Sequence, residues 1–102
     1  MTRRATPMPP FPCPCCGHAT LTTRSEYEIC PVGFWEDDGT GAEDATRQSG
    51  PNHLSLAEAQ RTFAQIGAVH PRHVRHVRPP RPDEPRDAGW RPGDAGKAGD
   101  AL

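Results

Sequence analysis

The sequence predicts a small α+β domain: a β-hairpin between two Cys-Pro turns, one α-helix that covers the hairpin, and disordered tails at both ends. Three observations predict this fold class. All four cysteines lie between positions 13 and 30, two short segments between them suit strands, and one later segment has the period and end signals of a helix. Only 33% of the 102 residues are hydrophobic, so a bound metal ion would stabilise the small core substantially.

The cysteines form two turns with the spacing of metal ligands. In the first turn, Cys13 and Cys16 have the C-x-x-C spacing that places two thiolates about 3.8 Å apart on one zinc ion. Gly17 follows and accepts the positive φ with which such turns often close. The second turn begins at Cys30 and repeats the Cys-Pro format. We therefore expect a zinc-ribbon-like site in which Cys13, Cys16 and Cys30 hold Zn²⁺.

Gly33 stands where the second turn would carry a fourth thiolate. In one interpretation Cys15 or His18 supplies the fourth ligand, and His18 could reach back with less strain because Cys15 is adjacent to Cys16. In another, water takes the fourth position, but no general base accompanies it in a recognisable motif, so we expect no enzyme. In a third, the metal site has been lost and buried thiols remain. Gly33→Cys should raise zinc affinity if the turn keeps its backbone geometry.

The hairpin is predicted from residues 20–23 and 26–29, which contain β-branched and aromatic residues in short alternating runs. A short polar connection joins these two segments and places the hairpin between the Cys-Pro turns. We expect the covering helix to bury Tyr27, Ile29 and Phe34 beneath it.

The helix is predicted from Leu56 to Ile66. Ser55 is placed as its N-cap, Glu58 three residues later completes a capping box, and Gly67 fits the position where a helix ends. An apolar stripe with the helical period is formed by Leu56, Ala59, Phe63 and Ile66. A stripe this narrow suits a helix that covers the rest of a small domain.

The composition divides the chain into a flexible N-terminal tail (1–10), the folded domain (11–69) and a disordered Pro/Arg-rich tail (70–102). The histidines of the last part recur every third residue, at His70, His73 and His76. For this tail, the alternatives are a solubilising segment, a contact with nucleic-acid phosphates, or metal capture. The formal net charge of −1 disfavours a dedicated nucleic-acid-binding protein, so that function is kept as an alternative.

No segment has the apolar length of a signal-peptide core or a membrane span, so a cytoplasmic protein is expected. In a reducing compartment, clustered cysteines favour metal binding over disulfides. A thiol redox protein is a further alternative, although the βαβ context of a thioredoxin-like motif is absent.

Three blocks follow one another along the chain: FPCPCCG, EYEICPVGFWEDDG and GPNHLSLAEAQRTFAQIGA. In this order they resemble the cysteine-rich CPCC family, small bacterial proteins named for the tetrapeptide Cys-Pro-Cys-Cys. The resemblance covers residues 11–69 and implies a zinc-ribbon-like fold with an added helix. The family pattern usually has a second Cys after Cys-Pro-Val, where this chain has Gly33. The resemblance implies no settled activity, and the role we expect is a binding or interaction module.

The segment FWEDD is the expected partner-binding surface, because acidic side chains beside an exposed Trp could dock a basic partner. Its residues are Trp35, Glu36, Asp37 and Asp38. The acids of this region lack the alternate spacing of a calcium loop. We expect a protein partner at this surface, with nucleic acid less favoured and no membrane.

Overall fold

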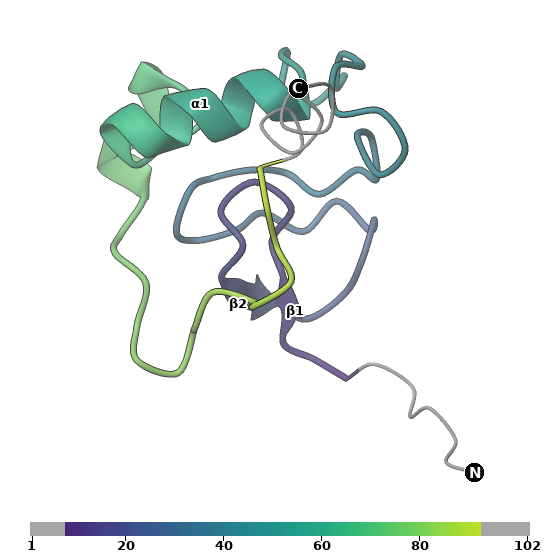
Figure 1. The fold of residues 1–102 in the computed structure, drawn as a ribbon. Coiled ribbons are helices and arrows are strands. Elements are labelled where there is room, and N and C mark those ends of the chain that lie inside the picture. Colours follow the sequence, from purple (N-terminus) through teal and green to yellow (C-terminus); the bar gives the residue numbers. More distant parts are fainter. Residues whose placement is uncertain (1–7, 93–102) are drawn as a thin grey trace, which may run out of the picture.

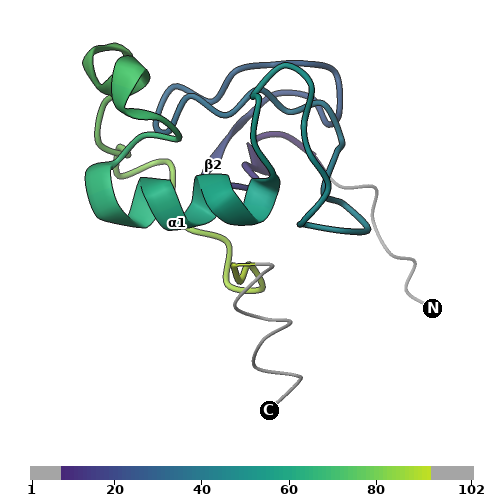
Figure 2. The same cartoon turned by 90° about the horizontal axis from the view of Figure 1, so that it is seen from above.

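The computed structural model describes residues 8–92. Along the chain it has β1 (Phe11–Pro12), β2 (Ala19–Leu21), α1 (Leu56–Ile66) and η1, a 3-10 helix (Pro71–His76). β1 and β2 pair antiparallel, and Figure 1 shows α1 across the connecting loops from this pair. Seen from above in Figure 2, η1 lies beside the C-terminal end of α1. The predicted small α+β fold, one hairpin with one helix, is confirmed.

The strands enclose the first cysteine turn instead of joining the two turns. Phe11 of β1 pairs with Leu21 of β2, so the strand predicted over residues 20–23 is found only in part. The strand predicted over residues 26–29 is wrong, because Ile29 alone forms an isolated bridge there. The sheet is therefore a short clasp around one turn.

Local backbone angles explain why the second predicted strand does not form. Ser25 and Tyr27 have left-handed φ values of 57° and 69°, which interrupt an extended strand. The Glu28 carboxylate accepts hydrogen bonds from the backbone N–H groups of Thr22 and Thr23, at 2.8 and 3.0 Å. The chain therefore curls between β2 and the second cysteine turn.

The helix α1 has the predicted bounds because its end signals are satisfied locally. The backbone N–H of Glu58 donates to Ser55 Oγ at 3.1 Å, and the N–H of Ser55 donates to Glu58 Oε1 at 2.8 Å. These two bonds form a capping box. Gly67 ends the helix with a left-handed φ of 79°. Within residues 8–92, no helix is both long and apolar enough to cross a membrane.

The buried face of α1 covers the cysteine turns rather than the strands. Gln60 is buried on this face, and its Nε2 donates to the Pro14 carbonyl in the first turn at 3.0 Å. Ile66, predicted on the apolar stripe, is 41% exposed. The predicted burial of Tyr27 and Ile29 under the helix is wrong, since these residues are 61% and 43% exposed.

The core of the domain is built around sulfur. All four cysteines are fully buried, together with Leu21 and Trp35. The same cluster contains Val32, Ala45, Leu56, Ala57, Ala59 and Val69. Side chains from both turns, β2 and α1 therefore meet at the cysteines, so the turns form the centre of the hydrophobic core.

Residues 70–92 belong to the folded structure, which corrects the tail predicted from residue 70. After η1, Arg78 and Glu84 form a bidentate ion pair with two N–O distances of 2.8 Å. Residues 85–87 then pair with the chain around the first cysteine turn. Prolines and charges disfavour a long helix, but they do not prevent extended pairing of this kind. Of the predicted tails, residues 1–7 and 93–102 lie outside the described residues.

Candidate metal centre

The two cysteine turns share one pattern of backbone hydrogen bonds. The N–H of Gly17 donates to the Cys13 carbonyl at 2.7 Å, and the N–H of Phe34 donates to the Cys30 carbonyl at 2.8 Å. Gly17 and Phe34 also share a left-handed φ, of 80° and 73°. By this correspondence, Gly33 occupies the position in the second turn that Cys16 occupies in the first.

Phe34 takes the left-handed position of the second turn, which costs free energy for a bulky residue. Its ring stacks on His73 of η1, with ring centroids 4.2 Å apart, and lies 5.5 Å from the ring of His76. These contacts offset part of that cost. Two of the three tail histidines therefore pack on the second turn, in a segment predicted to be disordered.

The sulfur atoms of Cys13, Cys16 and Cys30 converge. All three lie within 4.8 Å of one another, and the Sγ atoms of Cys16 and Cys30 are 3.8 Å apart. Two thiolates on one tetrahedral zinc ion have about this separation, given Zn–S bonds near 2.3 Å. The predicted convergence of the two turns is confirmed, and the donor set and its spacing fit a soft or borderline metal ion.

Hydrogen bonds from neighbouring groups point at these sulfurs. Thr20 of β2 donates its hydroxyl to Cys30 Sγ at 3.1 Å, and the backbone N–H of Cys15 donates to Cys13 Sγ at 3.4 Å. Such bonds stabilise thiolates and orient metal ligands. Sequence reasoning missed Thr20, because its relation to Cys30 depends on how β2 lies against the second turn.

The three thiols share hydrogen bonds that set their acidities apart. Hydrogen bonds from Cys13 and Cys16, together with one from Thr20, lower the pKa of Cys30. Hydrogen bonding to Cys16 and Cys30, with burial, raises the pKa of Cys13. The three thiols therefore titrate as one coupled group, in which Cys30 is more acidic than Cys13.

Neither candidate for the fourth ligand joins the group. Among residues 8–92, the cluster of His, Cys, Asp and Glu donor atoms contains Cys13, Cys16 and Cys30 only. Cys15 is fully buried, and burial raises the pKa of its thiol. His18 Nδ1 lies 2.8 Å from the Glu84 carbonyl oxygen, and since a carbonyl can only accept, Nδ1 carries the proton.

An aromatic ring occupies the space beside Gly33. A Cβ atom at this position would lie 3.0 Å from Phe63 Cδ1 and 3.3 Å from Cε1. Gly33 is not among the residues with a left-handed φ, so its backbone would accept a side chain without strain. The helix therefore covers the point from which a fourth thiolate would extend.

The segment FWEDD does not present the expected surface. Trp35 is fully buried and Asp37 is 5% exposed. The Asp37 carboxylate accepts a hydrogen bond from the Ser25 backbone N–H at 2.8 Å. The expectation of an exposed Trp beside acidic groups is therefore wrong, because Trp35 is a core residue and Asp37 supports the loop before the second turn.

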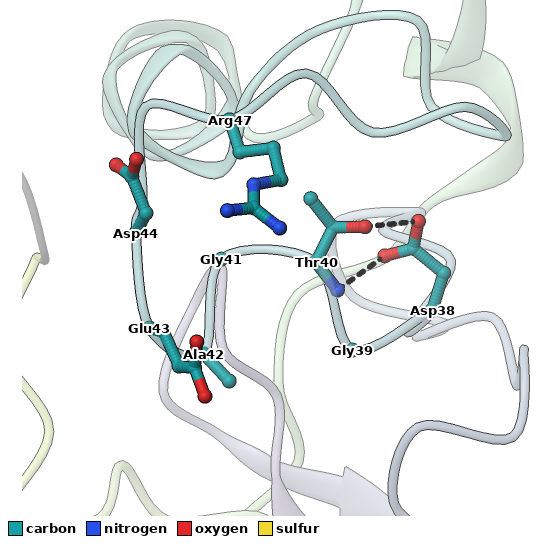
Figure 3. Close-up of a pocket in the computed structure, with 8 residues that line it drawn as sticks. All are labelled: Asp38, Gly39, Thr40, Gly41, Ala42, Glu43, Asp44 and Arg47. Carbon is teal, nitrogen blue, oxygen red and sulfur yellow. Dashed lines mark hydrogen bonds between the residues drawn. The ribbon is translucent and has the colours of Figure 1, made fainter.

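The acidic loop that follows borders a pocket of about 310 Å³ (Figure 3). Asp38 accepts hydrogen bonds from the backbone N–H and the hydroxyl of Thr40, at 3.0 and 2.8 Å. In Figure 3 the carboxylates of Asp38, Glu43 and Asp44 point in different directions. They do not converge on one point, in agreement with the lack of calcium-loop spacing in the sequence.

The fold and the site together define a small cysteine-rich domain whose three convergent, buried thiols are able to hold a metal ion. A family model for the cysteine-rich CPCC proteins matches residues 11–84, and the chain belongs to this family. The match extends past the domain end predicted at residue 69. No curated protein and no solved structure matches the chain.

Proposed function

We propose that this protein is a zinc-stabilised binding module whose ion is held by Cys13, Cys16 and Cys30. The observation that carries the proposal is the convergence of three buried sulfur atoms from two turns of the same backbone pattern. Zinc is favoured by thiolate ligands, and its binding free energy would add to the stability of a domain with a small core.

A structural role suits this site better than a catalytic one. Catalytic zinc sites keep a position open to substrate, whereas the three ligand residues here are fully buried. The hydrogen bonds from Thr20 and from the Cys15 N–H would hold the thiolates in place once the ion is bound. The role that we propose for the ion is therefore to maintain the fold of the module.

Metal content tests this proposal directly. Protein purified without chelators should contain about one zinc ion per chain, and Cys30→Ser should lower this ratio strongly. Cys15→Ala is the matched control, because Cys15 is equally buried but lies outside the three-sulfur group. Chelation by EDTA should lower the melting temperature by at least about 8 °C. Each kcal/mol lost from the free energy of unfolding lowers the melting temperature of a domain of this size by about 4–8 °C, and loss of the ion should cost at least about 2 kcal/mol.

Two results would sink the proposal. One is a zinc ratio near zero together with an unchanged melting curve in EDTA. The other is a Cys30→Ser variant that keeps the full zinc content of the unmodified protein, because the second turn would then contribute nothing to the site.

A further inference from the structure

Residues 84–90 form a segment, called here the clamp, that lies against the first cysteine turn. The backbone N–H of Ala19 in β2 donates to the Pro85 carbonyl at 3.0 Å, and the N–H of Asp87 donates to the Gly17 carbonyl at 2.7 Å. His18 and Arg86 form an antiparallel bridge between these bonds. The clamp thus pairs through this isolated bridge with the chain at the start of β2, and in Figure 1 it is the yellow-green segment that passes β2.

The clamp and α1 bind the outward-facing carbonyl groups of the first turn. Trp90 Nε1 donates to the Pro14 carbonyl at 2.8 Å, and Arg86 Nε donates to the Cys16 carbonyl at 2.9 Å. Gln60 of α1 donates to the same Pro14 oxygen. Since the N–H of Cys15 points at sulfur, both faces of the turn are fixed by hydrogen bonds.

Packing of Trp90 explains a second requirement for glycine at position 17. A Cβ atom on Gly17 would lie 2.5 Å from Trp90 Cδ2, which is too close for any residue with a side chain. The guanidinium carbon of Arg86 lies 4.8 Å from the centre of the Trp90 ring, in cation–π geometry. Gly17, Arg86 and Trp90 therefore form one contact on the outside of the turn that carries Cys13 and Cys16.

The clamp is also anchored where it begins. Glu84 pairs with Arg78 through two hydrogen bonds of 2.8 Å, and its carbonyl accepts a hydrogen bond from His18 Nδ1 at 2.8 Å. This carbonyl contact ties the start of the clamp to the residue that follows the turn. The clamp is thus fixed at Glu84, along residues 85–87 and at Trp90.

We propose that the clamp holds the first cysteine turn in its metal-binding geometry and slows release of the ion, with Arg86 and Trp90 as positioning residues. The proposal rests on the metal site proposed above. A turn ordered before binding loses less conformational freedom when the ion binds. Release requires the turn to open, and opening must first break the clamp contacts.

The test uses full-length zinc-loaded protein and an excess of a chromophoric chelator. Arg86→Ala and Trp90→Ala should each release zinc about tenfold faster, the factor expected from losing roughly one to two net hydrogen bonds. Trp90→Phe, which keeps a ring but loses the N–H donor, should give an intermediate rate. Arg91→Ala and Tyr27→Ala are matched controls at exposed positions and should release zinc at the unmodified rate.

A second readout separates positioning from general stability. Hydrogen exchange of the peptide covering residues 13–19 should speed up in Arg86→Ala and Trp90→Ala. Ser55→Ala, which removes the helix cap and lowers overall stability, should leave this peptide protected under conditions where the protein stays folded.

The outcomes distinguish the clamp from the metal site. Zinc-loaded protein with equal release rates and equal exchange in all variants would overturn the clamp and leave the metal site standing. Protein that holds no zinc would defeat the metal site, while faster exchange at residues 13–19 in the two clamp variants would still support the clamp as a brace for the turn. Ser55→Ala matching Trp90→Ala in both readouts would overturn positioning.

Discussion

Gly33 is the residue that sets this site apart from a four-thiolate one. It occupies the position equivalent to Cys16, and Phe63 lies where its side chain would extend. The sequence identifies Gly33 as a departure from the family pattern, but it does not show what fills the space. Phe63 is thirty residues further along the chain, so its contact with Gly33 depends on how α1 packs.

Restoring a cysteine at this position tests the role of Phe63. Gly33→Cys alone should raise zinc affinity little, because the new Cβ atom would lie 3.0 Å from the Phe63 ring. Gly33→Cys combined with Phe63→Ala should bind zinc at least about 100-fold more tightly than Phe63→Ala alone. A direct ligand should contribute at least as much affinity as a hydrogen-bond partner of a ligand, whose loss costs about 10- to 100-fold. Affinity is measured by competition with a chelator of known strength.

Phe63→Ala is the control in that comparison, because it removes core contacts without adding a ligand. If Gly33→Cys alone binds zinc as tightly as the double variant, the ring does not obstruct the fourth position. If neither binds more tightly than its parent, a fourth thiolate cannot reach the ion from position 33.

At the residue scale, local chemistry was predictable and long-range contacts were not. The spacing of Cys13 and Cys16, with Cys30 beyond, was enough to predict their convergence. The acidic residues after Trp35 predict an exposed side chain, whereas the structure buries it with the apolar residues before it. For the clamp, the sequence offers a signal in Trp90, a single large aromatic residue in a Pro- and Gly-rich segment.

At the element scale, α1 was predicted to the residue and the hairpin was not. The bounds of α1 follow from Ser55, Glu58 and Gly67, which act within a few residues of each helix end. Strand pairing depends on partners farther away. Here the residues that flank the first cysteine turn pair with each other, as in the bond from the Cys13 N–H to the His18 carbonyl. β1 and β2 therefore pair around the first turn.

The ion pair between Arg78, which follows η1, and Glu84 of the clamp should make stability depend on pH. Hydrogen bonds from Arg78 lower the pKa of Glu84 from its ordinary 4.5 to about 2. A carboxyl group with a lowered pKa stabilises the folded state above its ordinary value, and this stabilisation is lost as the pH falls toward the folded value. Unmodified protein should therefore melt at a higher temperature than Glu84→Gln at pH 7, and the difference should shrink steadily below pH 4.5.

The measurement is thermal unfolding of both proteins between pH 7 and pH 3, with Asp83→Asn as a control of equal charge change. Asp83 is the neighbouring acidic residue and is exposed. A difference between unmodified protein and Glu84→Gln that stays constant from pH 7 to pH 3 would rule out this ion pair as a contributor to stability.

At the scale of the whole molecule, composition predicts the end of the domain too early. Residues after 69 are rich in Pro and Arg, which suggested disorder, yet residues 70–92 pack on both cysteine turns. The hydrophobic core is small and centres on buried cysteines. Hydrogen bonds from Arg86 and Trp90 to carbonyl groups of the first turn add to the contacts that hold the domain together. The family match to residue 84 agrees with the longer domain.

The whole account depends on one ion held by sulfur from both turns. X-ray absorption at the zinc edge of the purified protein counts the sulfur neighbours of the ion and measures their distances. We expect three sulfur atoms at about 2.3 Å, reduced to two for whatever zinc Cys30→Ser retains. A spectrum with no sulfur neighbours, or one unchanged by Cys30→Ser, would contradict the account.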